Sequence, residues 1–180
     1  MLLTFNTNGM LPPGDYAMTI EELRSSILVI RSYDCDDSSW DYDWRLHLVE
    51  QLDVLCGNLW DVGITDIFVD GSFATTKSHP GDVDGYFLCE FDLFLSQQLP
   101  RLIAIDEAWD LNRRIPDMHG KFKPLMWHRY HVELYPQFHP PFECLTTAAL
   151  GSSGTPVLFP EFFRHTRSGE ARGIIRIIKE

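Results

Sequence analysis

Two aspartates separated by one residue follow a Gly-Ser turn, and these residue types at this spacing could bind a metal ion and a phosphate. The aspartates are Asp82 and Asp84, and the turn is Gly71-Ser72. Residues i and i+2 of a strand project from the same face, so the two carboxylates would repel each other unless a cation lay between them. Because Mg²⁺ and Mn²⁺ prefer oxygen ligands, the pattern predicts a site for one of these metals.

The turn before the aspartates has the residues needed to bind a phosphate. Gly71 allows a sharp turn and a close approach of the phosphate to the backbone. Ser72 offers a hydroxyl and a backbone N–H, and a helix beginning near Phe73 would add the favourable field of its N-terminal amides. Lys77 could bind phosphate as a point charge. We therefore expect Gly71, Ser72 and Lys77 to contact a phosphorylated ligand.

The same segment resembles the signature of the DNA polymerase β-like nucleotidyltransferase superfamily. That signature is a hydrophobic residue, Gly, Ser or Gly, a spacer of about nine to thirteen residues, and Asp-hydrophobic-Asp/Glu; here the spacer has nine residues. The run 71–74, Gly-Ser-Phe-Ala, is also similar to the minimal nucleotidyltransferases of bacterial toxin–antitoxin systems. The resemblance implies a third metal-binding carboxylate on a later strand. We assign that role to Glu133, which alternation directs away from the face of Val132 and Leu134.

The whole chain is similar to an uncharacterised family of short bacterial and phage nucleotidyltransferase-like proteins, a resemblance that implies no activity. It also departs from the superfamily pattern at two places. Gly85 follows Asp84 where an apolar residue is usual, and Thr75-Thr76-Lys77 stands where the minimal enzymes carry Arg-Gly. The segments that carry the whole-chain similarity are 9–14, 71–84, 162–163 and 172–175.

The resemblance to the nucleotidyltransferase superfamily implies a metal-dependent enzyme that transfers a nucleoside monophosphate from an NTP to a hydroxyl of an RNA (tRNA-like) or protein acceptor, in a toxin–antitoxin or phage-defence setting. The alternative is an inert protein of the same fold that binds a nucleotide or a protein partner, as an antitoxin does, or a second copy of itself. Both depend on three carboxylates converging beside the turn at 71–72, with no buried arginine or lysine that excludes a cation.

Other residues compete for these roles. Asp106 could be the third carboxylate, but its context favours a helix. A zinc site at His128, His131 and Glu133 is disfavoured because His128 would not share a strand face with the other two. Ser72 lacks the G-x-S-x-G context of a hydrolase nucleophile.

Several further side chains are expected to be structural or solvated. We expect His79 in a solvated loop near the phosphate side, and the tryptophans in the core or at its rim. The basic C-terminal residues fit a solvated strand edge as well as they fit a phosphate backbone. These residues are Arg164, Arg167, Arg172, Arg176 and Lys179, and the tryptophans are Trp40, Trp44, Trp60, Trp109 and Trp127.

Composition indicates a folded protein of 180 residues with a net charge of -11. Residues 1–99 carry 4 basic and 17 acidic residues, whereas residues 100–180 carry 11 and 9, which argues against a protein that coats nucleic acid by charge alone. No run approaches the roughly 20 apolar residues of a membrane helix, and the N-terminus has no signal-peptide pattern, so a cytoplasmic location is expected. The four cysteines are isolated in sequence and are expected to be reduced and mostly buried.

The order of periodic segments predicts an α/β (α+β) protein with a small mixed sheet flanked by helices, in one domain with an N-terminal extension (1–43), a catalytic core (44–135) and a C-terminal extension (136–180). A capping box at Thr19 and Glu22 predicts a helix to about Arg31. Leu48, Leu52, Leu55 and Leu59 predict a helix over 44–60. Strands are predicted at 64–69, 83–89, 130–135 and 173–178. Residues 92–114 are predicted to be mostly helical, with an interruption near Pro100. Loops are predicted at 32–43 and, as a flexible segment, at 151–154.

Overall fold

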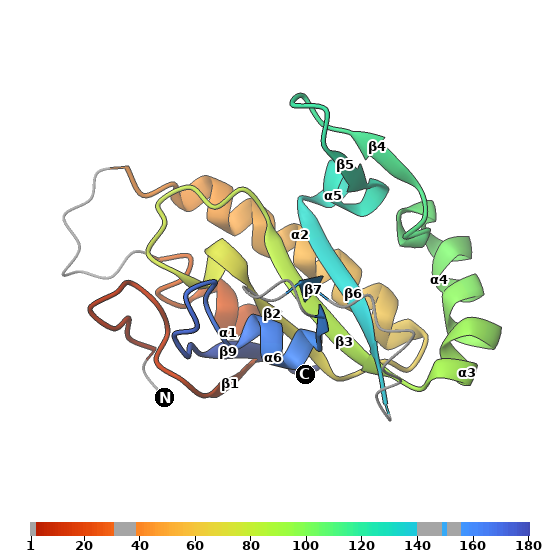
Figure 1. Ribbon diagram of the computed structural model, residues 1–180, viewed down its shortest axis with the longest axis horizontal. Helices are drawn as coiled ribbons and strands as arrows, with labels where there is room; N and C mark the ends of the chain where they lie inside the picture. Colours follow the sequence, from red (N-terminus) through yellow and green to blue (C-terminus); the bar gives the residue numbers. More distant parts are fainter. Residues whose placement is uncertain (1–2, 31–38, 140–148, 151–155) are drawn as a thin grey trace.

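A five-stranded mixed sheet forms the centre of the computed structural model, which describes residues 3–30, 39–139, 149–150 and 156–180 (Figure 1). The strand order is β1-β9-β2-β3-β6. The outer pairs β1–β9 and β3–β6 are parallel, and β2 is antiparallel to both of its neighbours. The predicted α+β class is therefore confirmed. The strands are β1 (Asp15–Met18), β2 (Ile67–Asp70), β3 (Val83–Cys89), β6 (Val132–Phe138) and β9 (Ile174–Ile177).

The long helix α2 (Tyr42–Asp61) covers one face of the sheet and builds the larger hydrophobic core. The four leucines that predicted this helix are fully buried. The helix begins two residues earlier than predicted because the Asp41 carboxylate caps it, accepting a hydrogen bond of 3.0 Å from the Trp44 N–H. A short helix, α1 (Ile20–Arg24), packs beside it.

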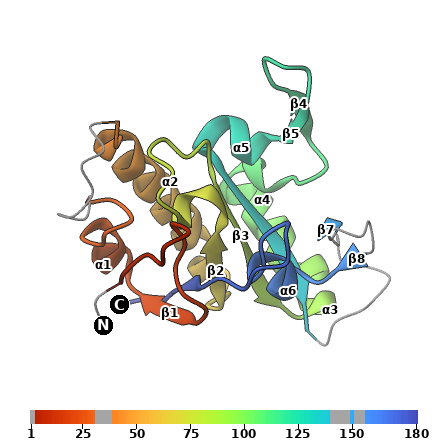
Figure 2. The same ribbon diagram turned by 60° about the vertical axis from the view of Figure 1, so that its left-hand side comes forward.

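The helix α6 (Phe159–Phe163) covers the opposite face, so the sheet lies between α2 and α6 (Figure 2). A smaller aromatic cluster forms there, in which Phe68 stacks on Tyr86 with ring centroids 4.9 Å apart. Strand alternation therefore assigns Phe68 of β2, Tyr86 of β3 and Tyr135 of β6 to the α6 face. Residues two positions away on these strands face the same side, and they include the carboxylates described below.

Several predicted boundaries were wrong. The first helix ends at Arg24 because the Ser26 hydroxyl donates to the Leu23 carbonyl and favours a turn. The predicted end, Arg31, lies outside the described residues. The strand predicted from residue 64 begins at Ile67. The strand predicted to stop at Pro136 continues to Phe138, since β6 is an edge strand, where a proline without an N–H is tolerated.

The stretch predicted to be interrupted near Pro100 is instead helical through that residue. Pro100 lies in the first turn of α4, directly after the π-helical turn η2, and this wider turn accommodates a residue without an N–H. The break falls at Asp106, whose backbone is extended. The helical pieces are α3 (Phe91–Leu93), a π-helical turn η2 (Phe94–Gln98), α4 (Leu99–Ile105) and a 3₁₀ turn η3 (Glu107–Trp109).

A hairpin that sequence patterns did not predict projects from the body of the protein (Figure 1). It consists of β4 (Arg114–Pro116) and β5 (Phe122–Pro124), and it leads directly into α5 (Leu125–Tyr130). A second two-stranded pair joins β7 (Ala149–Leu150) to β8 (Pro156–Val157).

Cys56 and Cys89 are buried free thiols, as expected. Cys35, Cys144 and the predicted loop at 151–154 lie outside the described residues. Among the helices in the described part of the chain, none combines the length and apolar character needed to cross a membrane.

Candidate metal centre

A row of carboxylates crosses three adjacent strands on the α6 side of the sheet. Asp84 of β3 is paired with Asp70 of β2 on one side and with Glu133 of β6 on the other. Asp82 precedes β3 by one residue and lies two positions from Asp84, so it projects to the same side. The register of the sheet thus brings together residues that are up to 63 positions apart in sequence.

Asp82, Asp84 and Glu133 converge on one point. One carboxylate oxygen from each lies within 4.8 Å of the others, and no other group of three or more acidic, histidine or cysteine ligands meets this condition among the described residues. Carboxylates this close repel each other unless a cation is present. An all-oxygen set of hard ligands suits Mg²⁺ or Mn²⁺, so these residues fit the expected metal.

Gly71 fixes the position of the turn against these acids. Its φ is +78°, a conformation that favours glycine, and a Cβ placed there would lie 3.1 Å from both the Cβ and the Cγ of Asp84. The expected helix near Phe73 is a single 3₁₀ turn, η1 (Gly71–Ala74). Ser72 is half-buried within this turn, and its carbonyl accepts a hydrogen bond of 2.7 Å from the Thr75 hydroxyl.

The loop after the turn is held by a buried arginine. Arg45 of α2 is fully buried, and its guanidinium donates to the carbonyl oxygens of Phe73 (3.0 Å), Thr75 (2.9 Å) and Lys77. Burial lowers the pKa of Arg45 to about 10. The Lys77 side chain is exposed, and in the described part of the protein no ion pair joins it to the acidic site.

Lys123 of β5 contributes a cation to the acidic site. Its ammonium donates to a Glu133 oxygen and lies 3.6 Å from Asp82 Oδ2. The Lys123 side chain is 28% exposed and belongs to the projecting hairpin, so it neutralises two of the three acids without sealing the site. The sequence did not predict a role for Lys123, because the short strand that carries it has no recognisable pattern.

Two aromatic side chains orient the same carboxylates. The Trp127 indole N–H donates to Asp82 Oδ2 at 2.8 Å, and the Tyr135 hydroxyl donates to the second oxygen of Glu133. Burial and the nearby Glu133 carboxylate raise the pKa of Tyr135 well above its usual range, so the hydroxyl remains a donor. Asp82 and Glu133 are therefore each oriented by a neutral partner as well as by Lys123.

Burial and the neighbouring carboxylates raise the pKa of Asp84. Burial has the largest effect, and the neighbouring Asp82 and Glu133 carboxylates add to it, bringing the pKa of Asp84 to about 7 against the opposing effects of Lys123 and Arg172. The fully buried Asp70 is an additional acid for which the sequence predicted no role.

Asp70 has its own cationic partner. Arg172 Nη2 lies 2.8 Å from Asp70 Oδ2, with the arginine supplied by the segment just before β9. Burial nevertheless raises the pKa of Asp70 well above its ordinary value. The only sequence signal for Asp70 was an acidic residue at the end of an otherwise apolar strand.

The competing residues lie elsewhere. Asp106 pairs with Arg129 and Tyr130, so it does not join the acidic site. His131 was expected on a strand face with Glu133, but it has a left-handed backbone (φ 51°) and caps α5, and its ring packs against Trp127. The predicted sharing of a strand face was therefore wrong.

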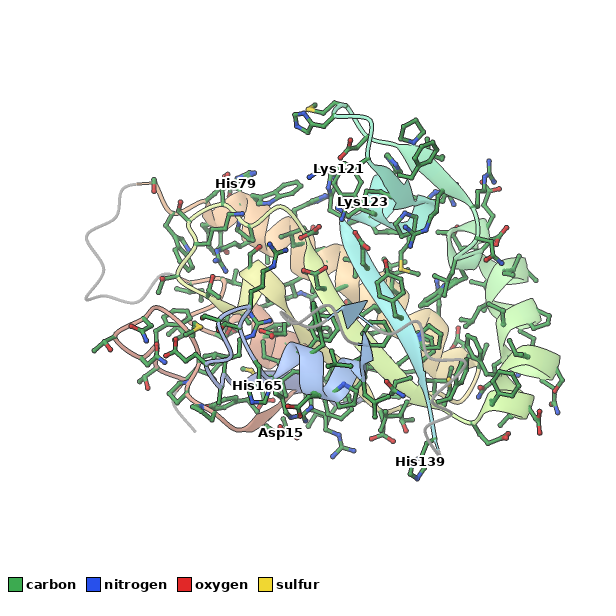
Figure 3. The ribbon with its side chains drawn as sticks, viewed as in Figure 1. Asp15, His79, Lys121, Lys123, His139 and His165 are labelled. Carbon is green, nitrogen blue, oxygen red and sulfur yellow. The ribbon has the colours of Figure 1, made fainter. Side chains whose placement is uncertain are left out.

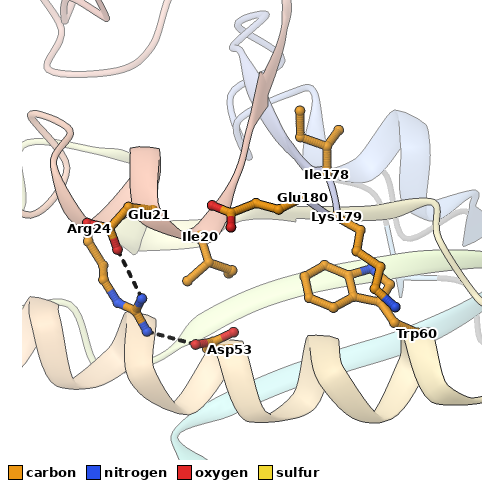
Figure 4. Close-up of a pocket in the computed structure, with 8 residues that line it drawn as sticks. All are labelled: Ile20, Glu21, Arg24, Asp53, Trp60, Ile178, Lys179 and Glu180. Atoms are coloured by element: carbon orange, nitrogen blue, oxygen red, sulfur yellow. Dashed lines mark hydrogen bonds and ion pairs between the residues drawn. The ribbon is translucent and has the colours of Figure 1, made fainter.

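A separate surface pocket of about 360 Å³ lies between α1, α2 and residues 178–180 (Figure 4). It shares no residue with the acidic site. Arg24 bridges Glu21 and Asp53 at 3.2 and 2.7 Å, while the Lys179 ammonium lies 5.7 Å from the centre of the Trp60 ring. Its charges are therefore largely paired within the protein.

The fold and the site together define an α+β protein with a three-carboxylate centre suited to a divalent metal. A family model described as a family of unknown function, DUF6932, matches residues 3–178, and the chain belongs to this family. No match was found among curated proteins or among solved structures.

Proposed function

We propose that this protein is a metal-dependent nucleotidyltransferase that transfers a nucleoside monophosphate from an NTP to a hydroxyl of an acceptor. The observation that carries the proposal is the convergence of Asp82, Asp84 and Glu133 beside the turn at Gly71. The resemblance of the 71–84 segment to the nucleotidyltransferase signature supports it from sequence.

In this proposal the metal, the turn and Glu133 have separate contributions to the reaction. Mg²⁺ or Mn²⁺, when held by the three carboxylates, supplies positive charge that offsets the triphosphate. Gly71 and Ser72 offer a backbone N–H and a hydroxyl to the phosphate oxygens. The acceptor oxygen forms a bond to the α-phosphorus as the bond to the bridging oxygen of pyrophosphate breaks. Glu133, oriented by Tyr135, takes the proton of the acceptor hydroxyl.

Transfer of label tests this function. The protein is incubated with each α-³²P-labelled NTP, Mg²⁺ or Mn²⁺, and either total RNA or a cell lysate. We expect label on an acceptor with the wild-type protein and with Asp92→Asn, a matched control at an exposed acid of α3. Asp82→Asn and Asp84→Asn should abolish transfer. Absence of label under every condition, with the wild type folded, would contradict the proposal.

A second function, a non-catalytic module that binds a nucleotide or a protein partner, is favoured by one observation. The ammonium of Lys123 already neutralises Glu133 and Asp82, so the acids are stabilised without a metal. For such a module we expect no label transfer and no binding of Mn²⁺, even after Lys123→Met removes the resident cation.

A further inference from the structure

The hairpin that carries Lys123 (residues 113–124) is a basic element in an acidic protein. Between residues 113 and 123 it holds four arginine or lysine residues and one aspartate, whereas the chain as a whole has a net charge of -11. Arg113 pairs with Glu107, but no carboxylate of the described residues lies within ion-pair distance of Arg114 or Lys121. Two cations of the hairpin are therefore available to an anionic partner.

The hairpin also exposes large apolar side chains. Phe122 is 64% exposed and Met118 is 92% exposed, although most aromatic rings of the protein are at least half-buried. Phe122 is the first residue of β5 and follows Lys121 directly, so an exposed aromatic ring is next in sequence to an ammonium group with no carboxylate partner among the described residues. This arrangement pairs a surface for stacking with contacts for phosphate.

A row of rings continues from the acidic site along the same side of the molecule. Trp127, which donates to Asp82, packs against His131 with ring centroids 5.3 Å apart; His131 meets Trp44 at 5.0 Å, and Trp44 stacks on His79 at 5.2 Å. We name these four rings the aromatic rim. Figure 3 shows His79 at one end of this upper side and Lys121 and Lys123 at the other.

The rim differs from the hairpin in charge. His79, whose side chain is 59% exposed, is 2.8 Å from Asp41 Oδ2, so its ring already has an acidic partner. Within this surface the hairpin supplies contacts to phosphate through Arg114 and Lys121, whereas the rim supplies aromatic surface. Aromatic rings lead away from the acids, and unpaired cations lie beside them. A flexible polyanion with planar bases therefore fits this surface better than a folded protein does.

We propose that the hairpin and the aromatic rim bind a single-stranded nucleic acid whose end presents the acceptor hydroxyl to the acidic site. The proposal rests on the proposed function for the use of that hydroxyl, but it concerns binding and can be measured without transfer. Lys121 contacts the phosphate backbone and Phe122 stacks on a base. The rim guides the strand along the side of the protein that leads to Asp82.

Fluorescence anisotropy with a labelled single-stranded RNA of about twelve nucleotides, in metal-free buffer, tests the proposal. We expect Lys121→Ala to weaken binding by about fivefold and to reduce the dependence of affinity on salt by about one phosphate contact. Phe122→Ala should weaken binding by about tenfold. Both side chains are exposed, so the fold should survive. Matched controls are Arg167→Ala, which removes an exposed charge after α6, and Ile103→Ala, which removes an exposed apolar side chain of α4; both should bind as the wild type does.

Failure of this inference is distinct from failure of the proposed function. Binding of RNA by Asp84→Asn, without transfer, supports the inference even when the wild type labels no acceptor. The inference is overturned if the wild type shows no saturable binding, if the two controls lose as much affinity as the hairpin variants, or if label is transferred from an NTP to protein but never to nucleic acid.

Discussion

Gly71 lies so close to Asp84 that the turn and the acidic site form one structural unit. A Cβ at Gly71 would be 3.1 Å from the Asp84 Cβ and closer still to the Oδ2 atom of that residue. The backbone at Gly71 has a φ of +78°. A phosphate bound at this turn would therefore lie next to the metal ligands. The glycine and the aspartate are 13 positions apart, and the antiparallel pairing of β2 with β3 places them together.

Gly71→Ala should damage the metal site and the fold together. The positive φ costs an L-residue about 1 kcal/mol, and the new methyl group would displace Asp84. We expect Mn²⁺ binding, measured by isothermal titration calorimetry, to weaken by about tenfold or more. Gly81→Ala is the matched control, because a Cβ at Gly81 meets nothing within 4 Å. Equal Mn²⁺ affinities for the two variants would refute the close coupling of turn and acid.

Lys123→Met should strengthen metal binding, because the ammonium competes with the metal for Asp82 and Glu133. The ion pairs are partly exposed, so we expect a gain of about fivefold in Mn²⁺ affinity. Lys121→Met, two residues away and without a carboxylate partner, should leave the affinity unchanged. Weaker binding by the Lys123 variant would mean that this lysine supports the metal-bound form and does not compete with the metal.

Metal affinity should decrease as the pH is lowered, because Asp84 takes up a proton. Burial, Asp82 and Glu133 raise the pKa of Asp84 to about 7, while Lys123 and Arg172 oppose the increase. The metal binds the ionised carboxylate, so below that pH Asp84 must release its proton when the metal binds. Mn²⁺ affinity should therefore fall by about tenfold from pH 8 to pH 6 and change little above pH 8. Calorimetry in buffers of different ionisation enthalpy measures the released proton, and a pH-independent affinity would contradict the effect.

Arg45→Met should destabilise the protein, because three carbonyl groups of the 73–77 loop and that of Leu28 would lose their donor inside the core. We expect the free energy of unfolding to fall by about 3 kcal/mol in urea titrations. Arg101→Ala, at an exposed arginine of α4, serves as the control and should change stability by about 0.5 kcal/mol or less. Similar losses for both variants would show that the buried guanidinium does not support the loop.

The parts of the fold that sequence could predict have strong periodicity. The leucines of α2 repeat at helical spacing and are all buried, and β3 occupies the predicted residues Val83–Cys89. The apolar run before residue 178 forms β9, which is buried except for Arg176. In each case one face must be buried, so the period of the pattern specifies the element.

The features that sequence could not predict depend on contacts between distant residues. The strands of the 113–124 hairpin have only three residues each and no alternation, so nothing indicated that Lys123 would reach Glu133. Asp70 was identifiable as a site residue only after the pairing of β2 with β3 placed it opposite Asp84. Glycine at position 85 departs from the superfamily pattern, yet a Cβ there would meet Leu134 Cδ2 at 2.9 Å, so packing between strands explains it.

A crystal structure of the protein with Mn²⁺ and a non-hydrolysable NTP analogue, with manganese located by anomalous scattering, would test the proposed metal site directly. We expect manganese bound by Asp82, Asp84 and Glu133, phosphate oxygens at Gly71 and Ser72, and the Lys123 ammonium displaced from Glu133. Manganese bound elsewhere, or no manganese while Lys123 keeps its place between the acids, would contradict it.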